Sequence, residues 1–172
     1  MPPADPPRGL LVVADTTPLM YLARTGLLDL LPRLFRRVIV PRTVWEELVV
    51  ARPDAEDVPT LRAATWLEID PGADGSAQML ALADNLDPGE AAAIALALLR
   101  GADLLLIDDL DGRRAATARG LSIRGTLGVL VEATRAGLLP ALRPALDTLL
   151  GAGFRLDERL ARLALEAVGE DA

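Results

Sequence analysis

The sequence contains no histidine, no lysine and no cysteine. Without histidine, the chain has neither a Ser-His-Asp or Cys-His catalytic group nor an imidazole metal ligand. Without lysine, it has no Schiff-base chemistry and no P-loop lysine. This absence also argues against receiver domains and haloacid-dehalogenase-like phosphatases, two α/β classes with acidic pockets that usually use a lysine. An enzyme with this composition is left with carboxylates, hydroxyls, arginines and bound metal.

Other features are missing as well. The absence of cysteine removes disulfides and fits a reducing cytoplasm, where we expect the protein to be. No uncharged apolar run is long enough to predict a membrane span. The first residues, "MPPADPPRG", lack the apolar core of a signal peptide and predict a disordered N-terminus over 1–9. The remaining 10–172 fit one domain. A net charge of -7 argues against sequence-independent coating of nucleic acid but allows a local basic groove.

The hydrophobic pattern predicts an α/β fold. Short apolar runs predict strands at residues 10–15, 36–41, 65–69, 102–109 and 121–125. Longer periodic segments predict helices at residues 17–24, 26–35, 41–51, 87–101, 111–119, 126–137, 140–151 and 157–168. The polar segment 52–60 and the Gly/Asp/Ser segment after residue 69 are predicted loops. Strands that alternate with helices favour a mostly parallel sheet, which binds ligands at the carboxyl ends of its strands.

Acidic residues occur where the predicted strands end. Asp15 ends the first strand, while Asp108 and Asp109 end the "LLLI" strand. All three therefore belong to the same edge of a parallel sheet. Glu90 lies at the start of the helix that leads into the second of these strands. We expect these carboxylates to converge.

A further acid comes from the helix after the second strand. Glu47 shares a helical face with Val44 and Leu48 and so interrupts an apolar stripe. Its neighbour Glu46 lies about 100° away around the helix and is better placed to cap with Thr43. The pattern therefore favours Glu47 as the inward acid.

Each acid also has an ordinary structural alternative. Asp15 and Asp109 could be N-caps of the helices that follow them. Glu90 could close a capping box with Asp87, and Glu47 could reach solvent. Together, however, these acids would repel one another and raise one another's pKa values. A divalent cation removes that cost, and hard carboxylate oxygens suit Mg²⁺ or Mn²⁺.

The ordered motifs resemble a known family. They are "VADTTPLMYLARTGLLDLL", "VIVPRTVWEELV", "LDPGEAAAIALALLRGADLLLIDDLDGRRAA", "LSIRGTLGVL" and "AGFRLDERL". Over residues 10–169 the chain resembles PIN-domain proteins, specifically the branch of small prokaryotic VapC-like toxins with a "DTSPL"-type first motif. The resemblance implies a PIN-like three-layer sandwich with a mostly parallel central sheet. It also implies a ribonuclease that hydrolyses RNA phosphodiester bonds with Mg²⁺ or Mn²⁺, as the toxin of a toxin–antitoxin pair.

The resemblance assigns roles to individual residues. The catalytic and metal-binding acids it implies are Asp15, Glu47, Glu90 and Asp108. Because Asp108 and Asp109 are adjacent, Asp109 is an alternate or additional metal ligand, and Thr16 supports the first acid. The implied partners are an RNA substrate and an antitoxin protein; we also expect a homodimer and no membrane association.

Two questions stay open. Arg113 and Arg114 follow Asp108 closely and could hold phosphates, or they could form a solvated helix face. The leucine-rich helices at 126–151 could be core or an association surface. The alternative functions are accordingly a PIN-like module that binds metal or nucleic acid without turnover, and a chain that acts through protein association.

Overall fold

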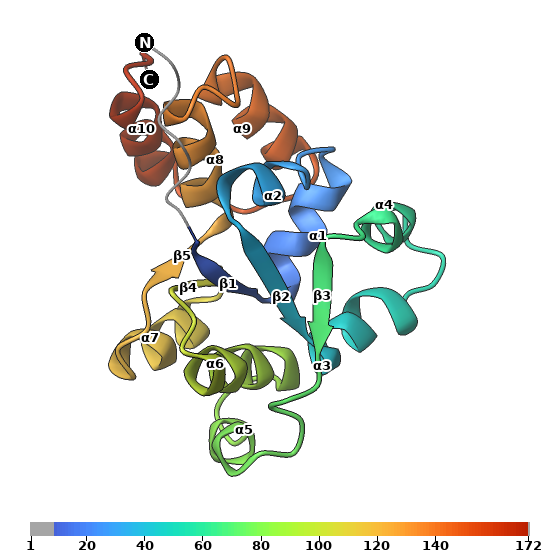
Figure 1. Ribbon diagram of the computed structural model, residues 1–172. Helices are drawn as coiled ribbons and strands as arrows, with labels where there is room; N and C mark the ends of the chain where they lie inside the picture. Colours follow the sequence, from blue (N-terminus) through green and yellow to red (C-terminus); the bar gives the residue numbers. More distant parts are fainter. Residues whose placement is uncertain (1–8, 172) are drawn as a thin grey trace.

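A five-stranded parallel sheet forms the centre of the computed structural model, which describes residues 9–171 (Figure 1). The strands are β1 (Leu11–Ala14), β2 (Arg37–Pro41), β3 (Leu67–Asp70), β4 (Leu104–Leu106) and β5 (Ile123–Arg124). Their order is β3-β2-β1-β4-β5, so the direction of chain progression reverses between β1 and β4. The predicted α/β class with a parallel sheet is confirmed. Residues 1–8 of the predicted disordered N-terminus lie outside the described residues.

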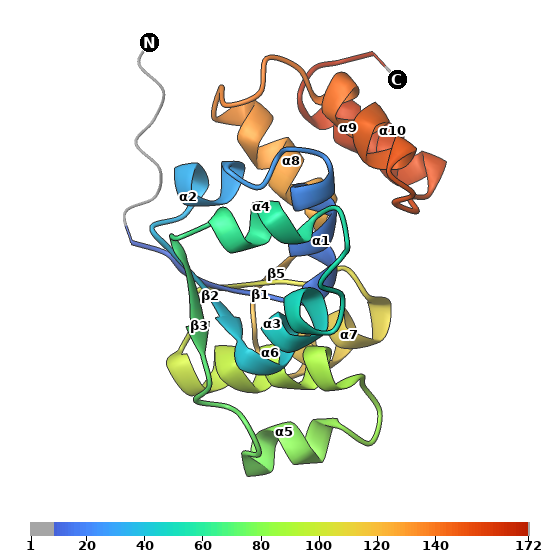
Figure 2. The same cartoon turned by 90° about the vertical axis from the view of Figure 1, so that its right-hand side faces the viewer.

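Helices cover both faces of the sheet and make three layers (Figure 2). One face carries α1 (Thr16–Arg24), α2 (Leu30–Leu34), η1 (Glu46–Val50), α4 (Val58–Ala63), α8 (Thr126–Arg135), α9 (Leu142–Gly151) and α10 (Glu158–Ala167). The other face carries α5 (Ala77–Leu82), α6 (Pro88–Arg100) and α7 (Leu110–Ala118). The short helix α3 (Arg42–Trp45) joins β2 to η1 and contacts α6. No helix within residues 9–171 is long and apolar enough to cross a membrane.

The central strand β1 contributes to both hydrophobic cores. Val12 and Ala14 belong to the core under α1 and α8, whereas Val13 belongs to the core under α6. This alternation follows from the two-residue period of a strand. Because both faces are covered, the strand is apolar without interruption until Asp15. The charged residue is therefore the first polar group after a buried strand.

Helix α6 brings a second set of acids to this strand edge. Residues 89–97 of this helix are all buried, and five of them are alanine, so the helix can lie close to the sheet. A capping box of Asp87 and Glu90 begins the helix, and Gly101 in the left-handed region (φ 59°) ends it. The predicted helix at 87–101 is confirmed.

Two predicted loops and two predicted helices need correction. Segment 52–60 contains the start of α4, because Val58 and Leu61 pack into the core. The segment after residue 69 contains α5, which Ser76 caps by accepting from the Met79 N–H at 3.1 Å. The predicted helix at 26–35 is reduced to α2, after a turn at Gly26 (φ 70°). The predicted helix at 41–51 divides into α3 and the π-helical η1, a type of segment that occurs often at functional sites.

A buried ion-pair triad holds the connection before α4 in place. The Asp57 side chain is fully buried and accepts from Arg24 at 3.2 Å and from Arg52 at 2.8 Å. Arg52 also donates to the backbone carbonyl of Leu48 at 2.9 Å. Burial opposes ionisation of Asp57, but the two arginines outweigh it and hold the pKa of this carboxyl below its usual value. The triad ties α1, η1 and α4 together.

Asp57→Ala is expected to lower the free energy of unfolding by about 3 kcal/mol, because two partly buried guanidinium groups lose their carboxylate. Urea denaturation measures the loss. Asp54→Ala is the control, since Asp54 is exposed in the same connecting segment. An equal effect of the two substitutions would contradict the role of the triad.

Candidate active site

Asp15 lies at the end of β1, where the strand passes into α1. Its backbone N–H donates to the Leu106 carbonyl at 2.9 Å, which fixes the end of β1 beside the end of β4. The residue occupies the N-cap position of α1 with extended backbone angles, but its side chain makes no capping hydrogen bond. The capping alternative therefore does not explain why a carboxylate is placed here.

One oxygen of the Asp15 carboxyl is buried without a partner, although the Thr16 backbone N–H acts on the same carboxyl and opposes the rise of its pKa. The residue is 3% exposed, and its Oδ1 atom is the buried side-chain polar atom without a hydrogen bond in the described part of the chain. Burial raises the pKa of Asp15 to about 7, and the negative charges of Asp87, Glu90 and Glu47 add to this rise. A carboxylate in such a place is costly unless a positive charge joins it.

Glu47 reaches the same place from η1. Its Oε2 atom accepts a hydrogen bond from the Thr16 hydroxyl at 3.3 Å, and burial together with the charge of Asp87 raises its pKa. Glu46 is exposed, whereas Glu47 is half-buried. A Cβ atom on Gly89 would overlap the Glu47 carboxylate. Glycine at residue 89 therefore lets the start of α6 approach Glu47 without displacing its carboxylate.

Glu90 closes the cap of α6 and also lies among the acidic residues of the site. Its Oε2 accepts from the Asp87 N–H at 3.3 Å, while its own N–H donates to Asp87 Oδ1 at 2.8 Å. The residue is 8% exposed, and burial raises the pKa of Glu90 to about 7, with the charges of Asp87 and Asp109 adding to the effect. The structural alternative for Glu90 is thus present, and the capping box itself brings Asp87 to the site.

Asp108 is held by the first residue of α8. Its Oδ1 accepts from the Thr126 N–H at 2.8 Å, and its Oδ2 accepts from the Thr126 hydroxyl at 2.6 Å. Burial raises the pKa of Asp108, against the hydrogen bonds from Thr126 and the nearby charge of Arg113. A Cβ on Gly125 would lie 2.8 Å from Asp108 Oδ1, so the chain again comes close through a glycine.

The neighbouring Asp109 is exposed and caps α7. Its Oδ1 accepts from the N–H groups of Asp111 at 2.9 Å and Gly112 at 3.2 Å. The capping alternative is therefore present here too. Its charge also acts on Glu90, whose pKa it helps to raise.

The acids gather at one edge of the sheet but do not form a closed cluster. Asp15 lies in the field of Glu47, Glu90 and Asp87, while Asp108 lies beyond the end of β4 and faces Thr126 and Arg113. Within residues 9–171 no three acidic side chains lie close enough together to hold a metal ion. Sequence reasoning identified Asp87 only as a cap and did not identify Thr126 at all. The capping pattern "DPGE" was the available signal for Asp87, whereas nothing in the sequence indicates the contact of Thr126 with Asp108.

The two predicted phosphate-binding arginines have different surroundings. Arg113 is half-buried, donates to the Ile107 carbonyl at 3.0 Å and lines a groove beside Asp108. Arg114 is exposed and pairs with Asp111 at 3.6 Å. Only Arg113 therefore lies next to the acids.

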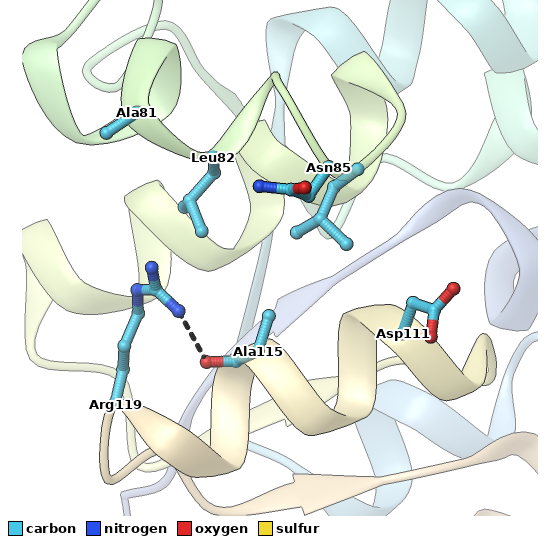
Figure 3. Close-up of a pocket in the computed structure, with 7 residues that line it drawn as sticks. Ala81, Leu82, Asn85, Asp111, Ala115 and Arg119 are labelled. Atoms are coloured by element: carbon cyan, nitrogen blue, oxygen red, sulfur yellow. Dashed lines mark hydrogen bonds between the residues drawn. The ribbon is translucent and has the colours of Figure 1, made fainter.

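Another hollow, of about 390 Å³, lies between the end of α5 and α7 (Figure 3). Arg119 closes one side and donates to the Ala115 carbonyl at 3.0 Å, while Asp111 lies farther along α7. None of the buried acids of the sheet edge lines this hollow. It is separate from the acidic site.

The donor set suits a hard divalent cation. All the candidate ligands are carboxylate oxygens, the type of ligand that Mg²⁺ and Mn²⁺ prefer. The buried Oδ1 of Asp15 has no other partner, and the pKa values of all four predicted acids are raised. A cation at this edge would offset both the burial and the mutual repulsion of the carboxylates.

The fold is a parallel α/β sandwich, and its acidic residues lie at the carboxyl edge of the sheet. These two features place the protein in a class that has an acidic site suited to a cation. The chain belongs to the PIN-domain family: the family model DUF3368, described as a PIN domain, matches residues 11–170. PIN domains are typically nucleases, and they generally use divalent metals. No curated protein and no solved structure matches the chain.

Proposed function

We propose that this protein is a divalent-metal-dependent ribonuclease that hydrolyses RNA phosphodiester bonds and is a VapC-like toxin of a toxin–antitoxin pair. Membership of the PIN-domain family supports a nuclease. The observation that carries the proposal is the buried, unpartnered Oδ1 of Asp15, which lies in the field of three further acids. The choice of RNA, and an antitoxin partner, rest on the resemblance of the "DTTPL" and "AGFRLDERL" motifs.

Different side chains have different roles in the proposed reaction. Asp15, Glu47, Glu90 and Asp108 would hold Mg²⁺ or Mn²⁺, with Asp109 as an additional ligand; when bound, the cation would stabilise the charge that develops on the phosphate. The Thr16 hydroxyl, expected to support Asp15, donates instead to Glu47, and the Thr126 hydroxyl donates to Asp108.

Proton transfer and phosphate binding also need protein groups. The chain has no histidine, so either a carboxylate or the bound metal would have to handle the proton of the attacking water. Arg113, beside Asp108, supplies a guanidinium group for the phosphate.

A second candidate function is a PIN-like module that binds metal or nucleic acid without turnover. The observation that favours its nucleic-acid-binding form is the absence, within residues 9–171, of three acids close enough to hold a metal ion. An association role through the helices at 126–151 has less support, because the leucines at 130, 142, 146 and 149 are core residues. We also propose that the protein forms a homodimer.

Cleavage of a pool of structured RNAs tests the proposal and separates it from the second candidate. We expect cleavage with Mg²⁺ or Mn²⁺, none in EDTA, and recovery when the metal is added back, with discrete ends on mapping. RNA binding without any cleavage in either metal would support the non-catalytic module instead.

The inward position of Glu47 gives a paired prediction. Glu47→Gln is expected to lower cleavage by about a hundredfold or more, because a charged oxygen ligand is lost. Glu46→Gln changes the charge of an adjacent, exposed residue and is expected to keep activity within about twofold. Initial rates at saturating Mg²⁺ measure both. Equal losses, or the reverse order, would show that Glu47 does not face the site.

The close approach of α6 gives another prediction. Gly89→Ala puts a Cβ where the Glu47 carboxylate lies. Since the Glu47 side chain can turn away, the free energy of unfolding should change by no more than about 1 kcal/mol, whereas cleavage should fall about tenfold or more as Glu47 is displaced. Gly151→Ala is the matched control, because its Cβ would meet open space. Retained activity in Gly89→Ala would contradict the need for this contact.

A further inference from the structure

A groove of about 770 Å³ leads away from the acidic edge of the sheet. Its walls come from α1, the start of α7, the passage from β5 to α8, and segment 153–157 between α9 and α10. Asp108 and Thr17 line it, so the groove begins next to the acids. Whatever occupies it lies directly beside the proposed reaction site.

The carboxylates of the groove already have partners. Asp108 accepts from Thr126, and Asp109 caps α7. Asp157 caps α10 by accepting from the Arg159 N–H at 2.9 Å. Because these oxygens receive hydrogen bonds from the protein, they are less in need of an external cation than Asp15.

One arginine of the groove is different from the others. Arg113 donates to the Ile107 carbonyl, and Arg124 pairs with Glu132. Arg155 is exposed and makes no hydrogen bond or ion pair with any residue in 9–171 through its side chain. The groove therefore presents a guanidinium group that is free to bind an anion.

The backbone that carries Arg155 is held on both sides. The Tyr21 hydroxyl donates to the Gly153 carbonyl at 3.2 Å, and the Tyr21 and Phe154 rings meet edge to face with centroids 5.0 Å apart. Phe154 and Leu156 are half-buried against the core, while Arg155 between them is exposed. The guanidinium therefore extends from a fixed segment, which lowers the entropy lost on binding.

The groove also offers apolar surface. Leu110 and Leu160, which are 57% and 51% exposed, both line it, together with the aromatic side chains of Tyr21 and Phe154. Bases can use such a surface only when they are unpaired and unstacked, as in single-stranded RNA. A duplex would present only its phosphates and sugars.

We propose that this groove binds the single-stranded RNA that flanks the cleaved bond, with Arg155 holding a backbone phosphate and the apolar wall receiving a base. The inference rests on the proposed function, since it gives the acidic site its substrate path. A local arginine is needed because the protein carries a net charge of -7, which opposes RNA binding elsewhere. Arg155 is a substrate-positioning residue and takes no part in the chemical step.

The test measures binding without turnover. A fluorescein-labelled 12-nucleotide single-stranded RNA is titrated with wild-type protein in EDTA, and the anisotropy gives Kd. Arg155→Ala is expected to raise Kd about tenfold and to make the log–log salt dependence shallower by about 0.7. Arg155→Lys should recover part of the affinity. Arg159→Ala is the matched control: it removes the same charge from a nearby exposed position outside the groove, and its Kd should stay within about twofold.

Steady-state cleavage separates this inference from the proposed function. Arg155→Ala should raise KM about tenfold with kcat within about twofold of wild type. If wild type binds RNA in an Arg155-dependent way but cleaves nothing, the groove inference stands and the ribonuclease proposal fails. If Arg155→Ala and Arg159→Ala weaken binding equally, the groove inference is overturned whatever the cleavage result. The groove inference is also overturned if Leu160→Ser converts a dimer into a monomer and leaves RNA binding unchanged. Such a result would mean that a second copy of the chain, and not RNA, occupies the groove.

Discussion

Asp15→Asn is expected to lower the rate of RNA cleavage about a thousandfold or more, which corresponds to about 4 kcal/mol of transition-state stabilisation. Asparagine has nearly the same size and can still occupy an N-cap, so the local fold should be kept. The substitution removes the one charge at this edge whose oxygen has no partner in the described protein. In the absence of metal, the stability of the variant should equal or exceed that of wild type, since the repulsion with Glu47, Glu90 and Asp87 is relieved.

Asp111→Asn is the control for this substitution. Asp111 is exposed, pairs with Arg114, and lines the hollow of Figure 3 rather than the acidic site. Its removal is expected to leave cleavage within about twofold of wild type. Cleavage by Asp15→Asn at the wild-type rate would contradict the placement of Asp15 at the centre of the site.

The metal-free protein is expected to lose stability as the pH rises from about 5 to about 8. Asp15 and Glu90 both have pKa values of about 7 in the folded chain, above their ordinary values of 3.8 and 4.5. Between the ordinary and the folded pKa the native state therefore binds more protons than the unfolded state, so the free energy of unfolding falls with rising pH. For Asp15 the fall amounts to at most about 4 kcal/mol, mostly complete near pH 7.

Urea denaturation in EDTA at several pH values measures this dependence. The acids whose pKa values lie below normal, Asp57, Glu68 and Asp70, stay ionised throughout this range and do not oppose the trend. Asp15→Asn should show a shallower dependence, and saturating Mn²⁺ should raise wild-type stability most at the alkaline end, by mass action. Stability that rises with pH, or an unchanged slope in Asp15→Asn, would contradict the burial of these ionisable groups.

The position of the acidic edge follows from the sequence because parallel strands impose it. Asp15 and Asp108 each follow a short apolar run, and such runs in an α/β fold end at the same edge. Helical periodicity likewise separated Glu47 from Glu46, even though the segment is π-helical and the predicted helix is divided. Local sequence patterns were therefore sufficient to place those residues whose position is set by the strand or helix that contains them.

Other features depend on contacts between distant segments. The hydroxyl of Thr126 meets Asp108 across eighteen positions of sequence, and no local pattern marks that pair. Arg113 and Arg114 are alike in sequence, yet only Arg113 turns toward Ile107 and Asp108. The helix α4 forms because Val58 and Leu61 enter the core, against a polar, proline-containing segment that predicts a loop.

The capping box at the start of α6 shows why structural and functional interpretations should not be treated as exclusive. Glu90 caps the helix and also takes part in the acidic field, and the same box places Asp87 beside Asp15. A sequence pattern that indicates a cap thus accounts for the backbone hydrogen bonds without excluding a second role. That second role is visible in the folded chain, where burial and then the neighbouring charges of Asp87 and Asp109 raise the pKa of Glu90.

The most direct test of the central claim, that Asp15 is the core of a divalent-cation site, is calorimetric titration of Mn²⁺ into protein freed of metal with EDTA and then dialysed. We expect saturable binding to wild type and to Asp111→Asn, and at least about tenfold weaker binding to Asp15→Asn. Binding to Asp15→Asn as tight as to wild type, or no binding to wild type at all, would contradict the claim.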